Sequence, residues 1–232
     1  MAFPSPAKKF GGDLVDVVGL PGGDVVASVA DIAGHGLSAG ILMGMLKTAA
    51  RTILLDAGPP ETSLPLLLDK LNRVLPAVKE PQMYATLTAF RLNADGRVWY
   101  AMAASPPILY RRLRGNELQT VHEQQFPLGL LAQAGFSGGA MQLAAGDVLL
   151  VATDGILEVC NRNGEEFGQA RLEDTLMACA GQPLPLVAQE ILAKARSFGP
   201  QTDDQTLLLI RRSSQPAALG QALVTAAASG SA

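Results

Sequence analysis

The chain has 232 residues and a mass of 24.2 kDa, which suits one large domain better than two small ones. Apolar residues make up 48% of it and the mean hydropathy is +0.23, so it can bury a core and is not disordered along its whole length. The formal net charge is −3 with no block of lysine or arginine, which argues against a nucleic-acid partner. Two cysteines, Cys160 and Cys179, are too few for a disulfide framework, so we expect a reducing, cytoplasmic setting.

Neither a signal peptide nor a membrane span is expected. The first ten residues carry two lysines and lack the apolar centre of a signal peptide. The most apolar helical stretch, Leu37–Leu55, contains Lys47 and Arg51, which favours a core helix over a membrane span.

The first third of the chain is predicted to form two strands and then two helices. A Pro-Gly-Gly-Asp turn joins the strands Leu14–Leu20 and Asp24–Ile32. Apolar residues then recur every four positions through Gly36–Asp56, as in an amphipathic helix. A second helix is expected to begin near Ser63 and to stop before Pro76, because proline lacks the N–H that a helix interior requires.

The rest of the chain is predicted to form mostly strands. The expected strands are Tyr84–Leu92, Arg97–Ala103, Ile108–Leu113, Leu118–His122, Gly135–Leu143 and Asp147–Thr153. The last two are expected to pair across the short turn 144–146. Two helices, Arg171–Ala180 and Leu184–Phe198, and a strand, Gln205–Arg212, follow, and the residues after Ser213 suggest a loose tail.

This order of elements lacks the β–α–β alternation of a parallel sheet. Successive hairpins favour antiparallel pairing, and helix pairs must then cover the outer faces of the sheets. We therefore predict an α+β fold, a layered sandwich of two antiparallel β-sheets flanked by helix pairs. Residues 1–212 are expected to form this domain and residues 213–232 a flexible tail.

Four aspartates stand where predicted strands begin or end: Asp13, Asp31, Asp154 and Asp203. Asp13 lies nine residues before Gly22, the centre of the first turn, and Asp31 lies nine residues after it. In an antiparallel hairpin they fall opposite each other, with side chains within about 5 Å if they share a face. Such carboxylates repel each other unless a cation lies between them. Asp154 and Asp203 are expected to emerge together at one end of a second strand pair.

An all-oxygen set of this kind favours hard ions such as Mg²⁺ or Mn²⁺. With two histidines and no clustered cysteines, a zinc site is poorly supported. Two hard ions could polarise a phosphoryl group and supply a hydroxide nucleophile at neutral pH. Aspartate beside glycine is also a common turn and cap residue, so any one of the four could be purely structural. The joint pattern favours the metal hypothesis.

Five segments carry motifs in a fixed order: Gly11–Asp16 (GGDLVD), Asp31–Ala39 (DIAGHGLSA), Phe126–Leu130 (FPLGL), Thr153–Glu158 (TDGILE) and Asp203–Leu207 (DDQTL). They resemble the GGDxxD, DxxGxGxxA, PLG, TDGxxE and DDxTL motifs of the SpoIIE-type bacterial branch of the PPM, or type 2C, metal-dependent protein phosphatases. Each motif alone is weak, but five in this order, over about residues 11–210, are specific.

This resemblance implies a serine/threonine phosphatase with two Mn²⁺ or Mg²⁺ ions. Asp31 would bridge both ions, Asp13 and the backbone carbonyl of Ile32 would serve one, and Asp154 and Asp203 would serve the other. A metal-activated water would attack phosphorus directly, without a phosphoenzyme. The implied substrate is phosphoserine or phosphothreonine on a protein such as an anti-sigma-factor antagonist, and an upstream sensor or receiver domain is a further implied partner.

Three residues beside the motifs are open to more than one interpretation. His35 could donate a proton to the leaving alkoxide, as a tentative general acid, or could simply face solvent. Asp16 is expected to bond locally or to reach a metal through water, and Asp204 is expected to have a secondary role.

One segment departs from the family pattern. Where the family often has NAGHPP, the chain has Met102–Pro107 (MAASPP), which lacks the asparagine and the histidine. This departure keeps a second hypothesis open, in which the domain is a non-catalytic phosphoprotein-binding module. A third hypothesis is a small-molecule phosphomonoesterase that uses the same metals.

Overall fold

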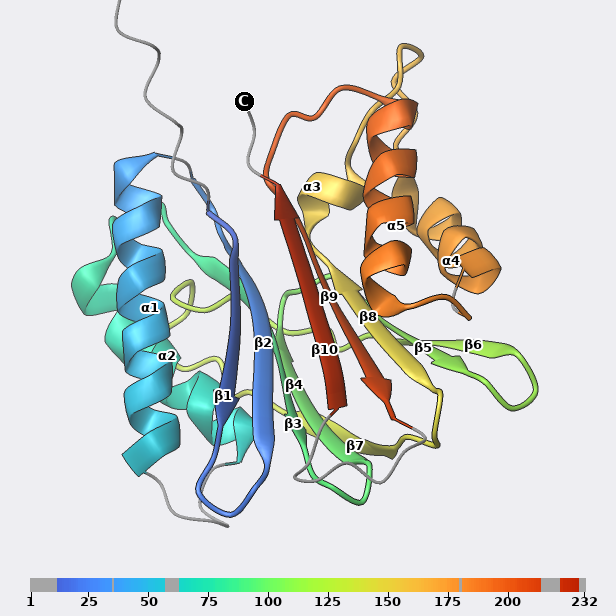
Figure 1. Cartoon of the computed structure of the whole chain (residues 1–232). Helices are drawn as coiled ribbons and strands as arrows, with labels where there is room; N and C mark the ends of the chain where they lie inside the picture. Colours follow the sequence, from blue (N-terminus) through green and yellow to red (C-terminus); the bar gives the residue numbers. More distant parts are fainter. Residues whose placement is uncertain (1–11, 35, 57–62, 180, 214–221, 230–232) are drawn as a thin grey trace, which may run out of the picture.

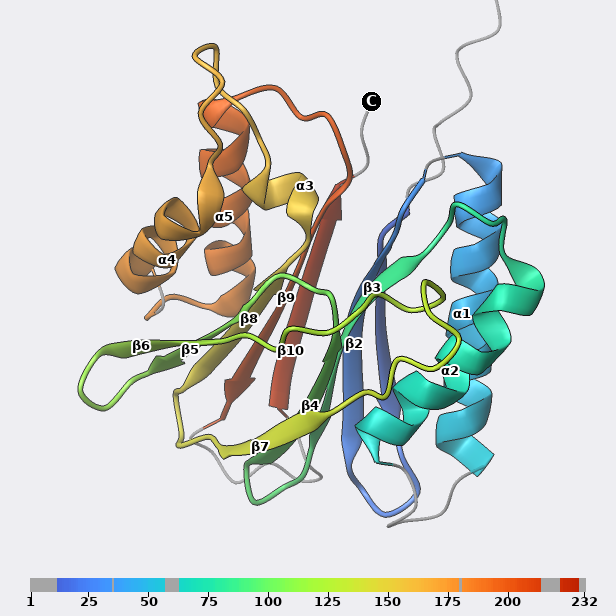
Figure 2. The same ribbon diagram turned by 180° about the vertical axis from the view of Figure 1, so that it is seen from behind.

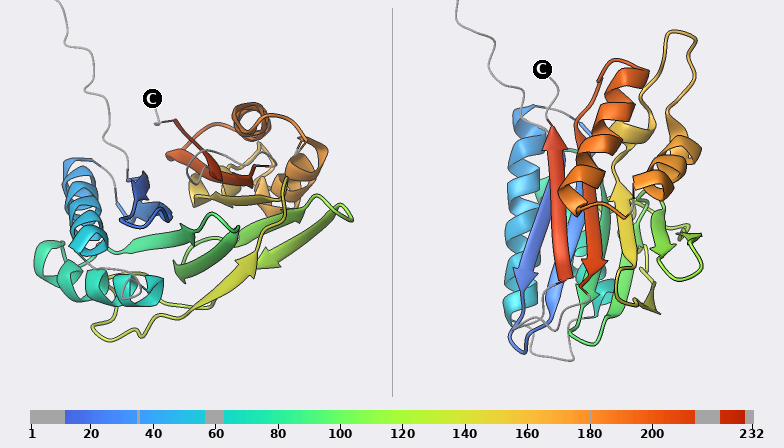
Figure 3. Two further views of the ribbon diagram at one scale, coloured as in Figure 1. Left: turned by 60° about the horizontal axis from the view of Figure 1, so that its bottom comes forward. Right: turned by 45° about the vertical axis from the view of Figure 1, so that its right-hand side comes forward.

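Two antiparallel sheets pack face to face, and helices cover their outer faces (Figure 1). The computed structural model describes residues 12–34, 36–56, 63–179, 181–213 and 222–229. Within these residues each sheet has five strands. Figure 3 shows the sheets between α1 and α2 on one side and α4 and α5 on the other. This arrangement confirms the predicted layered α+β sandwich.

The first sheet, sheet A, consists of β1 Leu14–Gly19, β2 Val25–Ile32, β3 Ala85–Leu92, β4 Arg97–Ala103 and β7 Gly138–Gln142, in the order β1-β2-β3-β4-β7. The second, sheet B, consists of β5 Ile108–Arg112, β6 Glu117–Val121, β8 Val148–Ala152, β9 Gln205–Arg212 and β10 Ala222–Ser229, in the order β10-β9-β8-β5-β6. The helices are α1 Leu37–Asp56, α2 Leu64–Val78, α3 Asp154–Leu157, α4 Gly168–Cys179 and α5 Leu184–Phe198. Figure 2 shows the same layers from behind.

The core consists of three apolar layers. The middle layer lies between the sheets and includes Phe90 of sheet A and Ile108 and Leu149 of sheet B, all at most 1% exposed. One outer layer joins α1 and α2 to sheet A, and the other joins α4 and α5 to sheet B. Burying each such side chain contributes about 1.5–3 kcal/mol. The two sheets are therefore held firmly together, which fixes the positions of their strand ends.

The prediction that β7 and β8 pair with each other is wrong. β7 pairs with β4 at the edge of sheet A, whereas β8 lies between β5 and β9 in sheet B. The turn 144–146 therefore carries the chain from one sheet to the other. The buried Asp147 holds this crossing, because its carboxylate accepts hydrogen bonds from the Tyr110 hydroxyl and from the N–H groups of Leu113 and Ala144, at 2.8–2.9 Å. A short turn in the sequence does not reveal which of the two connections it makes.

The prediction that the second helix stops before Pro76 is also wrong, since α2 continues to Val78. The proline costs only the bond that its missing N–H would have donated to Asn72. The N–H of Lys79 still donates to the carbonyl of Leu75 at 3.0 Å, and Leu75 is buried in the core. Tertiary packing thus outweighs the local preference.

The expectation of a loose tail after residue 212 is wrong for residues 222–229. These residues form β10, which pairs antiparallel with β9 from Ala222 opposite Arg212 to Ser229 opposite Gln205. Four of the eight residues of β10 are alanine, which has little intrinsic preference for strands, so the strand signal in this segment is weak. The edge of β9 supplies the backbone partners that the local pattern does not show.

α1 is, within the described part of the chain, the one helix whose length and composition would suit a membrane span. In the fold it packs on sheet A through Leu42, Leu46 and Leu54. Its Arg51 also pairs with the buried Asp16 of β1 at 2.6 Å. One apolar helix is weak evidence for a span. Only one face of α1 joins the core as expected, because Ile41, Met45 and Leu55 are 46–52% exposed.

Two leucines of α2 allow the buried face of this helix to be tested. Leu68 is fully buried and Leu66 is 40% exposed. We expect Leu68→Ala to lower the free energy of unfolding by about 2–5 kcal/mol, because it leaves a cavity against sheet A. The matched Leu66→Ala should change it by less than about 0.5 kcal/mol. Denaturant unfolding of both variants measures the difference, and equal losses would contradict the burial pattern.

Candidate functional site

The candidate site lies at the end of the sandwich where α3 begins, at the top of Figure 1. Asp13 immediately precedes β1 and Asp31 is near the end of β2, so both belong to sheet A. On sheet B, Asp154 follows β8 as the first residue of α3, and Asp203 lies two residues before β9. Because both sheets are antiparallel, these four strand ends meet at one edge.

The β1–β2 register brings the first two aspartates together. Leu14 pairs with Ala30, and the N–H of Ile32 donates to the carbonyl of Gly12 at 3.2 Å. Asp13 therefore lies opposite Asp31 in a non-hydrogen-bonded pair, the position at which cross-strand side chains are closest. The turn permits this register because Gly22 and Gly23 adopt positive φ angles of 105° and 95°. The opposition of Asp13 and Asp31, expected from counting, is confirmed.

The carboxylates disturb one another strongly. Burial, the largest cause, and the negative charges of Asp154, Asp13 and Asp203 together raise the pKa of Asp31 to about 8. Burial likewise raises the pKa of Asp13 to about 6, although hydrogen bonds from neighbouring side chains, including Thr153, oppose the shift. Burial also raises the pKa of Asp154, with Asp203 adding to the effect. Without a cation, these groups resist becoming charged together.

Three of the four aspartates line one cavity of about 650 Å³. Asp31 and Ile32 contribute from sheet A, and Asp154 and Asp203 contribute from the sheet B side. Asp13 is not among the lining residues and lies behind Asp31 in the hairpin. The structure thus collects the predicted residues from stretches of chain far apart in sequence.

Gly155 explains how Asp154 comes so close to Asp203. A Cβ atom at position 155 would lie 1.9 Å from the carbonyl oxygen of Asp204, which is backbone and cannot move aside easily. Only glycine therefore lets the first turn of α3 pack directly against the segment that leads into β9. The glycine of the TDG motif has this steric role.

Two hydrogen bonds join the sheets beside the cavity. The N–H of Gly12 donates to Asp204 Oδ2 at 2.9 Å, and the Thr153 hydroxyl donates to Asp13 Oδ2 at 2.9 Å. Asp204 is buried and acts as a brace between the sheets. Asp16 lies away from the cavity: burial alone would raise its pKa, but the hydrogen bond from Arg51 and the charge of Lys47 lower it. Asp16 therefore anchors α1 to β1 and contributes nothing to the site.

The donor set fits hard divalent cations. Among the described residues, no three histidine, cysteine, aspartate or glutamate side chains are grouped as tightly as in a closed metal site. Mg²⁺ does not need such a cage, because it keeps several waters and binds proteins through one or two carboxylates. Here the donors are all oxygen, they surround an open cavity, and they raise one another's pKa. A bound cation would offset that repulsion.

Sequence reasoning missed Asn72 of α2. Its buried side chain accepts a hydrogen bond from the N–H of Gly129 at 2.7 Å and donates to the carbonyl of Leu131 at 2.9 Å. It thereby fixes the Pro127–Leu131 loop, whose Pro127 and Leu130 line the acidic cavity. A polar residue beside an apolar helix stripe was the one available signal.

The segment Met102–Pro107 also borders the cavity. Ala104 lines it and has a φ angle of 49°, a left-handed conformation that costs a residue with a Cβ about 1–2 kcal/mol. Ala104 stands where the family pattern has glycine. Strain of this kind persists where the surrounding structure enforces it, often at functional sites. His35, the tentative general acid, lies outside the described residues.

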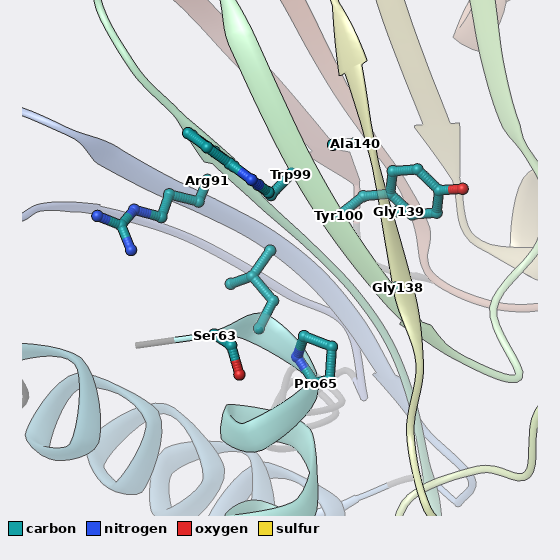
Figure 4. A pocket seen from close by; sticks show the side chains of 9 residues that line it. Ser63, Pro65, Arg91, Trp99, Tyr100, Gly138, Gly139 and Ala140 are labelled. Carbon is teal, nitrogen blue, oxygen red and sulfur yellow. The ribbon is translucent and has the colours of Figure 1, made fainter. Parts of the chain in front are cut away.

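A second cavity, of about 530 Å³, lies on the helix-covered side of sheet A. Figure 4 shows Trp99 and Arg91 of the sheet near Ser63 and Pro65 at the start of α2. Arg91 pairs with Asp24 at 2.6 Å, and its guanidinium lies 5.7 Å from the Trp99 ring centre. The residues that line this cavity include no carboxylate, so it does not compete as a metal site.

Two packed antiparallel sheets with helices on their outer faces are the fold of PP2C-type phosphatase domains. The PP2C domain of SpoIIE from Bacillus subtilis has this fold, with a TM-score of 0.72 at 20% identity over 86% of this chain and 58% of that one. The RsbU and RsbW domains of Rv1364c from Mycobacterium tuberculosis give a TM-score of 0.75 at 29% identity, over 91% of this chain and 57% of that one.

The family follows from the sequence comparison. The family model described as Stage II sporulation protein E (SpoIIE) matches residues 21–213, so the chain belongs to the SpoIIE family. A curated relative, the phosphoserine phosphatase RsbU of Bacillus subtilis (strain 168), is 26% identical over 216 residues. That match covers 91% of this chain and 62% of RsbU, so the chain spans less than two thirds of this relative's length.

The raised pKa of Asp31 predicts how stability depends on pH. The folded pKa of about 8 lies above the ordinary value of 3.8, so the stabilising effect of the proton is present at low pH and is lost as pH rises through about 8. We expect Asp31→Asn to raise the Tm of chelator-treated protein at pH 8 by at least about 3 °C. The gain should shrink toward pH 4. Asp174→Asn, at an exposed position on α4, is the control in thermal melts, and a gain that does not vary with pH would contradict the assignment.

The two hydrogen bonds of Asn72 can be removed with little change in volume by Asn72→Leu. We expect the free energy of unfolding to fall by about 1–3 kcal/mol, because the Gly129 N–H loses its buried acceptor. Amide hydrogen exchange at Gly129 should accelerate at least about tenfold relative to Lys79, whose N–H bonds to Leu75 within α2. Unchanged exchange at Gly129 would show that Asn72 does not hold the loop.

Proposed function

We propose that this domain is a metal-dependent protein serine/threonine phosphatase, which hydrolyses phosphoserine or phosphothreonine on a protein substrate. The observation that carries the proposal is the group of carboxylates that oppose one another's ionisation around one open cavity. Perturbed carboxylates of this kind mark functional sites. Membership of the SpoIIE family and similarity to the phosphoserine phosphatase RsbU support the same activity.

The residues that would hold two Mg²⁺ or Mn²⁺ ions are those brought together at the strand ends. Asp31 would lie between the ions, with Asp13 and the backbone carbonyl of Ile32 toward one and Asp154 and Asp203 toward the other. When bound, such ions act as Lewis acids on the phosphoryl group and activate water for direct in-line attack. The carboxylates would then remain ionised at neutral pH, since the cations offset the repulsion that raises their pKa.

The chain's other residues shape the site. The Pro127–Leu131 loop, held by Asn72, and Tyr84 form the cavity wall around the carboxylates. The leaving serine alkoxide requires a proton, and we propose His35, four residues after Asp31 in sequence, as the general acid.

We propose a cytoplasmic domain whose substrate is a phosphorylated protein of the anti-sigma-factor antagonist type. A sensor or receiver domain would control it, which agrees with the greater length of RsbU. These assignments rest on family resemblance.

The second candidate function is a phosphoprotein-binding module without turnover. Ala104 favours it, because a strained residue replaces glycine at the cavity wall and the segment lacks the family's asparagine and histidine. This version keeps phosphoprotein binding and predicts no phosphate release.

One experiment separates the two functions. We expect phosphate release from phosphoserine proteins and from p-nitrophenyl phosphate to require added Mn²⁺ or Mg²⁺ and to stop with chelator. Asp31→Asn, Asp154→Asn and Asp203→Asn should each lose at least about 100-fold in kcat/KM, or about 2.7 kcal/mol, because each removes a proposed ligand. Asp174→Asn, on the exposed side of α4, should retain full activity.

The controls decide between outcomes. Full turnover in chelator would contradict the phosphatase proposal. Tight phosphoprotein binding with no phosphate release at any metal concentration would support the binding module instead.

A further inference from the structure

The acidic cavity adjoins another pocket, which is different from the cavity near Trp99. Ala104 lines the acidic cavity and also a neighbouring pocket of about 500 Å³, so the two share one wall. The remaining lining of the neighbouring pocket comes from residues 122–126, which lie between β6 and the Pro127–Leu131 loop. We call this neighbouring pocket, which is lined by Ala104 and residues 122–126, the side groove.

Residues 122–126 have the pattern of an extended strand with no partner. His122, Gln124 and Phe126 are exposed, whereas Glu123 and Gln125 are partly buried. The two inward side chains are held, since Tyr100 donates to Glu123 at 3.2 Å and Gln125 donates to the Ser137 hydroxyl at 2.6 Å.

The backbone of this segment is available for pairing. Within the described part of the chain, the structure records no hydrogen bond from a main-chain N–H or carbonyl of residues 122–126. Both ends are fixed: Val121 pairs with Ile108 in sheet B, and Leu128 forms a bridge with Ala85 of sheet A. A backbone that is held at both ends and has no recorded main-chain partner is a template to which an extended peptide can add.

Large apolar side chains surround the openings. Phe126 is 51% exposed in the side groove, and Leu130 (55%) and Tyr84 (38%) are exposed at the acidic cavity. Exposed apolar groups at the mouth of a polar cavity mark a contact surface. Phe126 does not line the acidic cavity itself, so contact with it is expected from the chain on either side of a phosphorylated serine rather than from the phosphate group.

From this continuity we propose that the side groove receives the segment of the substrate protein next to the phosphoserine, in an extended conformation, with an apolar side chain against Phe126. The inference rests on the proposed phosphatase function and narrows its substrate class. The phosphorylated serine must lie in a segment that can be extended over several residues at about 3.3 Å each and must have an apolar residue nearby in sequence. A serine held inside a regular helix would not fit.

The test uses two nine-residue peptides with a central phosphoserine. One carries leucine two and three residues away on both sides, and the other carries serine at those positions. We expect the Mn²⁺-loaded protein to favour the leucine peptide by about tenfold in kcat/KM, mostly through KM, because a leucine is buried on Phe126. Phe126→Ala should reduce this preference to less than about twofold, and Phe126→Leu should retain a part of it.

The matched control is Leu186→Ala, on α5, where a leucine 47% exposed lies outside the residues that line either cavity. It should keep the full preference for the leucine peptide. An equal preference in wild type and Phe126→Ala would overturn the side-groove proposal, as would no preference in wild type. Loss of self-association in Phe126→Ala with unchanged peptide preference would also overturn it and would assign the groove to a second copy of the chain.

Failure of the underlying function is distinguishable from failure of this inference. If the wild-type protein with Mn²⁺ hydrolyses neither p-nitrophenyl phosphate nor either peptide, the phosphatase proposal itself fails. If it hydrolyses all of them without regard to leucine, only the side groove is wrong.

Discussion

The repulsion between carboxylates that the backbone forces together governs the candidate site. The β1–β2 register leaves Asp13 and Asp31 no way to separate, because moving one strand by a residue would send its helix-facing side chains into the layer between the sheets and the reverse. The packing of sheet B on sheet A then adds Asp154 and Asp203 to the same end. The apolar core between the sheets thus stabilises an arrangement that the repulsion between the four aspartates destabilises. A cation is the natural partner for such a site, because it converts this repulsion into attraction.

The neighbouring polar contacts limit how far the acidic residues can move apart. Asp204 and Thr153 join the sheets beside the cavity by hydrogen bonds of 2.9 Å. Gly155 allows the backbone of α3 to touch the segment before β9. Each contact lies next to one of the four aspartates in sequence. The shape of the candidate site therefore depends on residues that do not themselves line the cavity.

The sequence predicted the features that depend on local spacing. Counting from the turn at Gly22 placed Asp13 opposite Asp31, because a hairpin's register follows from its turn. The strand before Asp154 and the strand after Asp203 were found from their apolar runs. The predictions that were wrong concern features that depend on partners distant in sequence. β10 forms only because it pairs with the edge of β9, and α2 continues past Pro76 because its apolar face is buried in the core. β8 pairs with β9 in sheet B and not with β7. Asn72 escaped notice because its partners lie 57 and 59 residues away.

The crossing from β7 to β8 has a consequence for the biosynthesis of this domain. Each sheet is completed by strands far from its other members in the chain: β7 joins β4 only after β5 and β6 are made, and β8 gains β9 only after three helices. Because β9 pairs with β8 and also with β10, a growing chain therefore holds strands without their partners until about residue 229 has left the ribosome. Folding that depends on such non-local pairing is slow. A ribosome that stops before residue 203 would release a fragment that exposes apolar strand edges, a substrate for chaperones and proteases, and that fragment would lack Asp203 of the candidate site.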